Sequence, residues 1–226
     1  MSIKLPFWAT TLTLIGIIIL VSLGSWQLQR LAWKNDLITD LKAAYESENS
    51  ATLDLANIAE SRFTYGRVSG TFLPDKAILL GPRTRNKEIG HDLLVPLKVS
   101  NRTLIINMGW TKYKLDELPI HHLKNKKVRF EGLIRTPQWN SFTPENVPEE
   151  NLWYKADINE IAEVKDLKSP YPFILRAENA SHKFDAAFPN NERLMPNNNH
   201  MQYALFWFSM ALSLIVIYVL RFIVKR

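Results

Sequence analysis

A single histidine stands at the start of the second of two uncharged stretches in the chain. His200 precedes Met201–Leu220, a run of twenty residues without a charge, and four aromatic residues occupy the next turns: Tyr203, Phe206, Trp207 and Phe208. Neutral imidazole donates a nitrogen lone pair, and histidine is a common axial ligand of haem iron. The chain has no cysteine, so a haem here would be bound without covalent attachment. The alternative is a histidine at the membrane surface that faces lipid headgroups.

The other polar residues offer less chemistry. The pair His121-His122 lies in a lysine-rich segment that is typical of a solvated loop. His91 and Asp92 are neighbours entering a strand, where successive side chains point to opposite faces, so they make a poor catalytic pair. No nucleophile elbow or phosphate-binding glycine loop is present. The sequence therefore predicts a protein that is not an enzyme, and it disfavours a membrane-anchored hydrolase.

Two arginines follow a predicted strand and a Gly-Pro turn. Arg83 and Arg85 belong to the string GPRTR. Guanidinium groups bind carboxylates with a planar, two-pronged geometry. Arg83 is therefore a candidate for holding a partner's acidic group or a haem propionate, and the alternative is a structural salt bridge.

Two apolar runs are expected to position His200. A twenty-residue helix spans about 30 Å, the hydrocarbon thickness of a bilayer. Leu5–Gln29 is a second uncharged run, of twenty-five residues, and it lacks a convincing signal-peptide cleavage site. Trp8 and Trp26 lie near its ends, where indole rings favour the membrane interface. We expect two membrane-spanning helices, the first of them an uncleaved anchor.

The charges that flank the runs predict an orientation. Arg221, Lys225 and Arg226 follow the second run and mark that side as cytoplasmic by the positive-inside rule. Both termini are then cytoplasmic, and the long middle segment lies in the periplasm of a bacterium or, less favoured, in the mitochondrial intermembrane space. The leader MSIK lacks a transit-peptide pattern, which favours a bacterial inner membrane. The net charge of +6 is assigned to a solvated surface and membrane flanks, with no nucleic-acid partner.

The pattern between the spans changes from helical to β-like. After Trp26, apolar residues recur at helical spacing through Tyr45, and Thr52 is a candidate cap for a short helix over Leu53–Glu60. From Arg62 onward short β-prone runs alternate with Gly, Pro and Asn, at Phe63–Ser69, Ala77–Leu80, Asp92–Val99, Thr103–Asn107, Val128–Arg135, Leu152–Lys155 and Phe173–Ala177. Few helical crossovers separate these runs, so we expect antiparallel pairing in a barrel or sandwich. Asn101-Arg102 suggests a hairpin, and Asp157 should cap a helix over Ile158–Val164.

The expected fold class is a membrane α+β protein, with two transmembrane helices at the termini flanking one extracytoplasmic antiparallel β domain with a few short helices. The predicted segments are a cytoplasmic N-terminus (1–6), transmembrane helix 1 (7–28), a helical extension (29–61), the β domain (62–180), a loop (181–199), transmembrane helix 2 (200–220) and a cytoplasmic tail (221–226).

Several strings, taken together, resemble the surfeit locus protein 1 family of cytochrome c oxidase assembly factors. They cover nearly the whole chain in the right order: GSWQLQR at 24–30 with Trp33-Lys34, VSGTF at 68–72, LGPR at 80–83, Gly90 with Pro96-Leu97, NMGW at 107–110, Glu131-Gly132 with Arg135, FTPEN at 142–146, Trp153-Tyr154 and NNHMQYA at 198–204. Two positions depart from the family pattern: Met108 replaces an arginine and His91 replaces an aromatic residue. Neither departure touches the histidine position.

The resemblance implies a membrane protein that helps to build haem–copper oxidases. Bacterial members are thought to bind haem a and to transfer it to the oxidase catalytic subunit, and His200 occupies the place of the proposed iron ligand. The implied binding set is His200, Trp26, Gln27, Arg30, Tyr203, Trp207 and Arg83, with Arg30 and Arg83 as candidate partners of the propionates. Haem a would be bound transiently, and the haem a synthesis machinery would be a further partner. The alternative function is a cofactor-free scaffold that stabilises the nascent catalytic subunit.

Overall fold

The first uncharged run forms part of α1 (Phe7–Glu46), and the second forms α3 (His200–Val219), which continues into the π-helical turn η5 (Leu220–Val224). The computed structural model describes residues 6–46, 52–56, 58, 63–182 and 193–224. The chain divides into a helix unit, Met1–Asp40 with Met195–Arg226, and a sheet unit, Leu41–Leu194. The predicted helical continuation beyond Trp26 is confirmed, since α1 passes through Gly24 without interruption.

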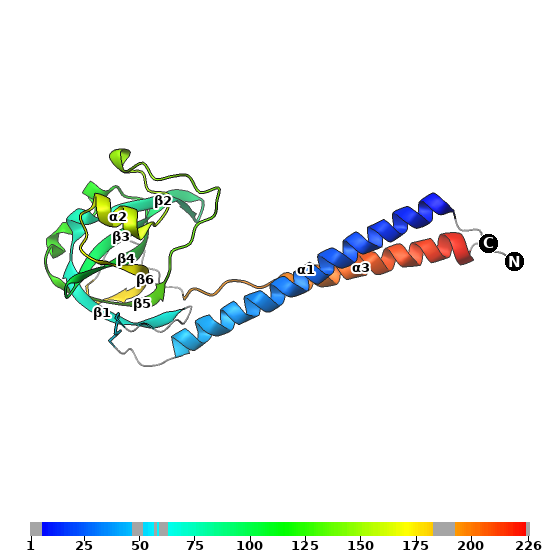
Figure 1. Ribbon diagram of the computed structural model, residues 1–226, viewed down its shortest axis with the longest axis horizontal. Coiled ribbons are helices and arrows are strands. Elements are labelled where there is room, and N and C mark those ends of the chain that lie inside the picture. Colours follow the sequence, from blue (N-terminus) through cyan, green and yellow to red (C-terminus); the bar gives the residue numbers. More distant parts are fainter. Residues whose placement is uncertain (1–5, 47–51, 57, 59–62, 183–192, 225–226) are drawn as a thin grey trace. The chain divides into compact units, whose positions relative to one another are not determined.

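The two helices of the helix unit run antiparallel and side by side (Figure 1). Thr10 Oγ1 lies 2.6 Å from the Tyr218 hydroxyl oxygen, and Gly16 and Gly24 lie against Leu214 and Phe208, respectively. A Cβ atom at Gly24 would come within 2.6 Å of the Phe208 ring. The absence of a side chain at Gly24 is therefore what lets the helices approach there.

Most of the large apolar side chains of the helix unit point outward. Among its described residues only Gly24, Ala204 and Ala211 are buried. By length and composition α1 and the His200–Val224 helix are both able to cross a membrane. Paired helices that bury small residues and expose large apolar ones are typical of helices in an apolar surrounding.

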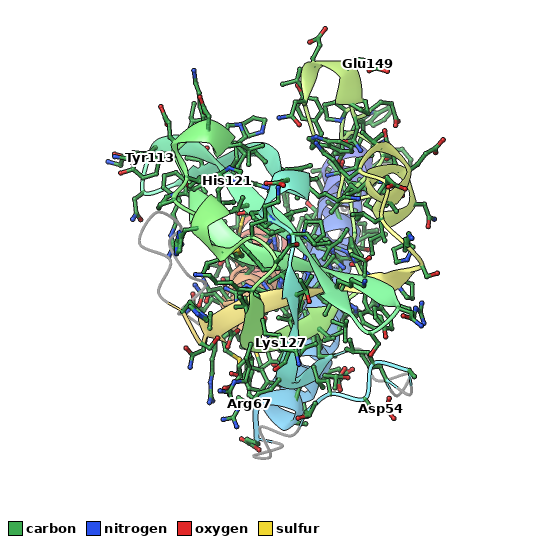
Figure 2. The ribbon with its side chains drawn as sticks, turned by 90° about the vertical axis from the view of Figure 1, so that its left-hand side faces the viewer. Asp54, Arg67, Tyr113, His121, Lys127 and Glu149 are labelled. Carbon is green, nitrogen blue, oxygen red and sulfur yellow. The ribbon has the colours of Figure 1, made fainter. Side chains whose placement is uncertain are left out.

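The sheet unit contains six strands: β1 (Thr64–Phe72), β2 (Ile78–Arg85), β3 (Glu88–Val99), β4 (Arg102–Thr111), β5 (Lys127–Arg135) and β6 (Pro170–Ala180). Its helical elements are short: η1 (Pro74–Lys76), η2 (Leu115–Glu117), η3 (His121–Leu123), η4 (Pro148–Glu150) and α2 (Ile158–Val164). Figure 2 shows Tyr113 and Glu149 at one end of this unit, and Arg67 and Asp54 at the other.

The sheet has the strand order β1-β5-β6-β4-β3-β2, and β1 also pairs with β3 through Thr71 and Phe72. The sheet therefore curls far enough for β1 to have a partner on both sides. The β-rich middle of the chain is confirmed, whereas the finer choice of a barrel or sandwich stays a prediction. The β3–β4 hairpin is also confirmed, with Val99 opposite Arg102.

Two apolar cores lie on opposite faces of the curled sheet. The larger, the inner core, includes Phe72, Leu97, Leu104, Phe130 and Leu175. The smaller, the outer core, packs Trp153 and Ile161 of the 153–162 region against strand residues such as Leu94, Ile105 and Ile174. Asp157 caps α2 as predicted, since its carboxylate accepts hydrogen bonds from the backbone N–H groups of Asn159 and Glu160.

Four local predictions are wrong. β4 and β6 pair in parallel, because the segment between them, with β5 and α2, is long enough to make a crossover. Leu152–Lys155 is not a strand but contributes isolated bridges, including one from Trp153 to Leu80. The string GPRTR does not follow β2 but belongs to it, with a register shift between Leu80 and Arg83.

The fourth error is the helix over Leu53–Glu60. Thr52 bridges to Arg67, and the Leu53 N–H donates to the Arg67 carbonyl, so this part pairs with β1. Residues 57, 59 and 60 of the predicted helix lie outside the described residues.

Candidate functional site

His200 is the first residue of α3, and its imidazole faces α1. Its Nδ1 atom lies 2.7 Å from Gln27 Oε1. Both side chains are half-buried. The helical spacing of His200, Ala204, Phe208 and Ala211 places these residues on one face of α3. The contacts of Phe208 with Gly24 and of His200 with Gln27 identify this face as the one that packs on α1.

The hydrogen bond to Gln27 fixes the chemistry of the imidazole. An amide oxygen only accepts hydrogen bonds, so the contact requires the proton on Nδ1. In the neutral form of the imidazole, the Nε2 atom then carries the lone pair. An oriented neutral imidazole with a hydrogen-bonded N–H and a second nitrogen available is the usual arrangement of a metal-ligating histidine.

Asn198 adds a second polar contact between the helix-unit segments. Its Nδ2 atom donates to Asn35 Oδ1 at 2.8 Å and lies 3.3 Å from the Leu31 carbonyl oxygen. Its own Oδ1 atom is buried and has no hydrogen-bond partner among the described residues. We call Gln27, Asn35, Asn198 and His200 the polar clasp. Asn35 and Asn198 were not predicted as partners, although the polar run Asn197–Asn199 was a usable signal.

Aromatic and cationic groups surround the polar clasp in the helix unit. Trp26 and Tyr203 are exposed, whereas Trp207 is half-buried and its ring meets Phe206 edge-on at 5.5 Å between centroids. The Arg30 guanidinium carbon lies 5.9 Å from the Trp26 ring centroid and 5.1 Å from that of Trp33. Stacking of this kind occupies the faces of a guanidinium and leaves its N–H edges available to an anion.

The seventh candidate residue, Arg83, belongs to the sheet unit. Its Nε atom lies 3.7 Å from Asp92 Oδ2, which is the salt bridge that the sequence left open as an alternative. Burial raises the pKa of the Asp92 carboxyl, and the positive charge of Arg83 opposes that rise. Six of the seven predicted site residues thus belong to the helix unit, and Arg83 belongs to the sheet unit.

The histidine pair of the sheet unit is engaged at its surface. His121 Nδ1 lies 3.3 Å from Asp75 Oδ1, and Lys124 forms an ion pair with the same carboxylate. The hydrogen bond from Lys124, supported by the contact with His121, holds the pKa of Asp75 below its usual range. No cluster of three or more His, Asp or Glu side chains suited to a metal ion occurs among the residues that the structure describes.

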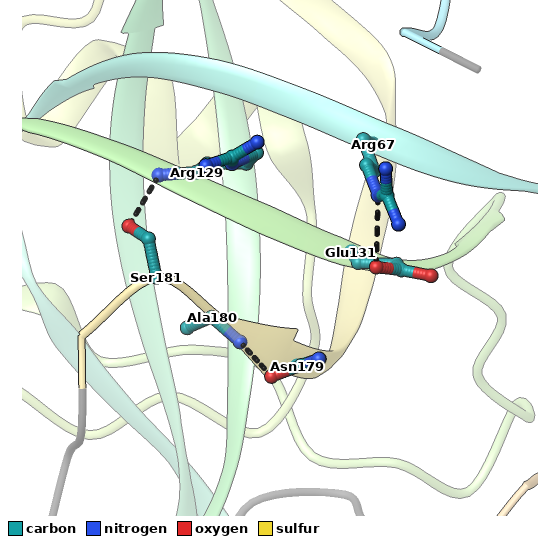
Figure 3. A pocket seen from close by; sticks show the side chains of 6 residues that line it. All are labelled: Arg67, Arg129, Glu131, Asn179, Ala180 and Ser181. Carbon is teal, nitrogen blue, oxygen red and sulfur yellow. Dashed lines mark hydrogen bonds and ion pairs between the residues drawn. The ribbon is translucent and has the colours of Figure 1, made fainter. Parts of the chain in front are cut away.

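A pocket of about 270 Å³ lies over β1, β5 and β6, and Figure 3 shows its lining. Arg67 Nε pairs with Glu131 Oε2 at 3.0 Å, and the Ser181 hydroxyl accepts a hydrogen bond from the Arg129 backbone N–H. Burial, and then the negative charge of Glu131, raises the pKa of Tyr65 to about 12. Because the Glu131 carboxylate already pairs with Arg67, this pocket is less suited to an anion than a pocket with an unpaired arginine.

Comparison with known proteins agrees with the resemblance in the sequence. The profile of the SURF1 family matches residues 14–212. A SURF1-like protein of Rickettsia bellii is 30% identical over 212 residues, which cover 91% of this chain and 87% of that protein. A SURF1-like protein of Rickettsia felis is 29% identical over 214 residues, covering 92% of this chain and 93% of the relative. Surfeit locus protein 1 of Xenopus tropicalis is 26% identical over 226 residues, covering 90% and 72%. The region matched by the family profile includes the whole sheet unit and part of each of the two helices, α1 and α3. The chain belongs to the SURF1 family.

Proposed function

We propose that this chain is a membrane-anchored, non-enzymatic assembly factor for haem–copper cytochrome c oxidase. In this proposal it binds haem a through His200 and transfers it to the oxidase catalytic subunit. The observation that carries the proposal is the 2.7 Å contact between His200 Nδ1 and Gln27 Oε1. That contact leaves Nε2 as an oriented donor, which is what a haem iron requires from a protein ligand.

The surroundings of His200 suit an amphipathic porphyrin. The exposed rings of Trp26 and Tyr203 supply apolar surface, and the N–H edges of Arg30 suit a propionate carboxylate. Arg83, in the sheet unit, is the second proposed propionate partner. A chain that supplies one imidazole, rather than a closed set of ligands, retains the moderate affinity that a transfer protein needs.

The helix unit fits a two-pass anchor. Its outward apolar side chains would be covered by lipid, and a helix of twenty residues matches a hydrocarbon layer of about 30 Å. Because the two helices are antiparallel, both termini lie on one side of the bilayer. The basic residues Arg221, Lys225 and Arg226 indicate that this side is cytoplasmic. The sheet unit would then be periplasmic in a bacterial inner membrane.

The proposal is tested by the absorption spectrum of the purified full-length protein after co-expression with the haem a synthesis enzymes. We expect a haem band in wild type that is lost in His200→Ala and in His200→Gln. The glutamine variant retains a group able to hydrogen-bond to Gln27 but is a poor iron ligand. His122→Ala, which removes an exposed histidine of the sheet unit, should retain the band. A colourless wild type, or a His200→Gln variant with an unchanged band, would overturn haem binding at this position.

One observation favours the alternative of a cofactor-free scaffold. The polar clasp joins the two segments of the helix unit through hydrogen bonds that need no cargo. In a scaffold His200 would act only as a packing residue. His200→Gln would then support oxidase assembly as well as wild type does, while wild type carries no pigment. Measuring oxidase activity in membranes beside the spectrum separates the two functions.

A further inference from the structure

A row of polar side chains continues the outer core of the sheet unit across five strands. Ile174 of β6 lies opposite Arg135 of β5, and Ile105 of β4 lies opposite Ile174. Two residues further along, Arg176 pairs with Asn107. Residues two apart on a strand share a face, so Asn107, Arg135 and Arg176 point to the same side as the outer core. Asp92 of β3 and Arg83 of β2 complete the row.

This row borders a pocket of about 420 Å³. Its walls include Arg83, Asp92, Asn107 and Arg135 from the sheet, and Trp139 and Tyr154 from the segment between β5 and α2. The pocket is thus lined both by polar groups of the sheet and by aromatic residues of the segment between β5 and α2. Such a combination is typical of a ligand site, in which apolar walls surround a few oriented polar groups.

The charges around the pocket do not cancel. Asp92 lies 3.7 Å from Arg83, and it accepts a hydrogen bond from the Asn107 side chain. Arg176 donates to Glu178 Oε1 at 2.7 Å. These contacts pair two guanidinium groups with two carboxylates. The guanidinium of Arg135 is left over, and it has no hydrogen bond or close ion pair to any residue in the described part of the chain.

The surroundings of Arg135 make this surplus costly. Burial, followed by the positive charge of Arg176, lowers the pKa of Arg135, and the negative charge of Asp92, which also pairs with Arg83, opposes that shift only in part. A half-buried cation beside two others destabilises a fold unless an anion joins it. A buried charge that the fold compensates only in part is a frequent feature of binding sites. One surplus positive charge suits a monovalent carboxylate better than a phosphate dianion.

The segment that covers the pocket also exposes large aromatic surface. Trp139 is 46% exposed, and Phe142, between the lining residues Asn140 and Thr143, is 93% exposed. An aromatic side chain so accessible beside a charged pocket gives a ligand more apolar contact area than a small free acid could use. A polypeptide segment can place one side chain in the pocket and a neighbouring one on Phe142.

We propose that this pocket binds an acidic side chain of a partner polypeptide, with the carboxylate on Arg135 and an adjacent apolar residue on Phe142. Arg83, Asp92 and Asn107 hold the walls of the pocket in place. The site would give the sheet unit a contact with a protein partner that is independent of haem binding at His200. Loss of haem in the spectral test above leaves this proposal untouched.

The test uses the full-length protein in detergent and two fluorescein-labelled peptides, acetyl-Gly-Phe-Glu-Phe-Gly and the same peptide with Gln in place of Glu. Fluorescence polarisation should show preferential binding of the acidic peptide. Arg135→Gln should weaken that binding about tenfold or more, because a charge-assisted hydrogen bond contributes about 1.5–3 kcal/mol. Phe142→Ser should weaken binding of both peptides. Arg129→Gln removes an exposed arginine from the same strand and should change neither.

Three results would overturn the proposal. The first is equal affinity of wild type for the two peptides, and the second is wild-type affinity in Arg135→Gln. The third is displacement of the acidic peptide by free acetate at equal concentration, which would indicate a site for small acids. If Arg135→Gln does not fold, Arg135→Lys replaces it. Lysine retains the charge but not the two-pronged geometry, so the proposal expects a folded protein with weaker acidic-peptide binding, and unchanged binding would contradict it.

Discussion

The helix unit and the sheet unit bury opposite kinds of residue. In the sheet unit Phe72, Phe130 and Trp153 are almost completely buried, and no charged residue of its described part is fully buried. In the helix unit the buried residues are Gly24, Ala204 and Ala211, whereas the large apolar side chains point outward. The sheet unit is organised against water, and the helix unit against an apolar surrounding. The same residue type therefore has a different structural role in each unit.

The candidate sites differ in the same way. At the polar clasp, His200 forms a hydrogen bond with the uncharged amide of Gln27, as expected for a site at the edge of an apolar region. In the sheet unit, Arg135 and its neighbours form a pocket with surplus positive charge. A neutral nitrogen donor suits a metal centre, and a guanidinium suits a carboxylate. The two units thus offer complementary chemistry to different ligands.

The largest expected difference in stability between the two units comes from replacing one glycine in each of them by alanine. At Gly132 a Cβ atom would lie 2.0 Å from the Arg176 carbonyl oxygen, in the backbone of the neighbouring strand. Backbone in a paired sheet cannot move aside, so Gly132→Ala should cost more than about 4 kcal/mol or prevent folding. At Gly24 the obstacle is the Phe208 ring, which can rotate, and Gly24→Ala should cost only about 1–3 kcal/mol.

Circular dichroism and limited proteolysis of the two variants in detergent would measure the difference. The double variant Gly24→Ala with Phe208→Leu should recover stability, because it shortens the obstructing side chain. A Gly132→Ala protein as stable as wild type would show that the β5–β6 contact is looser than described.

The next largest effect compares truncation of a phenylalanine in each unit. Phe72 is 0% exposed in the inner core, and Phe206 of α3 is 54% exposed. Phe72→Ala should destabilise the sheet unit by about 3–5 kcal/mol, because it leaves a cavity. Phe206→Ala should change stability in detergent by less than about 1 kcal/mol, because detergent solvates the ring already. Chemical denaturation of the full-length protein gives both values, and similar losses would contradict an inside-out helix unit.

Much of the secondary structure could be predicted from sequence, because its signals are local. The two uncharged runs predict the apolar parts of α1 and α3, and Asp157 predicts the start of α2 because it is a favoured N-cap residue. The end of β2, in contrast, could not be predicted from local signals. The string Gly81-Pro82-Arg83 signals a turn by itself, but the register shift against β3 keeps it within the strand. The parallel pairing of β4 with β6 depends on how the intervening chain crosses the sheet, and no pattern of single residues encodes that path.

The site residues show the same limit. His200 was a candidate because its type and its place beside an apolar run are visible in the sequence. Its orientation depends on Gln27, which is 173 residues away. Arg135 is one of several charged residues in β5, and Asn107 is a polar residue within the apolar part of β4. Only the register brings them to one face. Residue type predicts which chemistry is available, whereas the long-range register decides which residues share a site.

The smallest expected effect concerns an exposed ion pair, and it tests whether such pairs contribute to the stability of the sheet unit but not of the helix unit. Lys124 and His121 hold the pKa of Asp75 below its usual range, and the contact joins η1 to η3. The folded state then binds the Asp75 proton more weakly than the unfolded state does. Its contribution to stability is complete above the ordinary carboxyl pKa and is lost as the pH falls through the depressed value.

Asp75→Asn should therefore unfold at a slightly lower denaturant concentration than wild type at pH 7, and the two proteins should converge at low pH. Added salt should narrow the difference at pH 7, because solvated ions screen an exposed pair. The matched control is the same salt series on Gln27→Leu, which removes a hydrogen bond between uncharged groups. The difference in stability between this variant and wild type should not depend on salt. Salt sensitivity in Gln27→Leu would show that the polar clasp depends on charge. The contrast between the sheet unit and the helix unit, which we propose to face lipid, would then fail at its most informative contact.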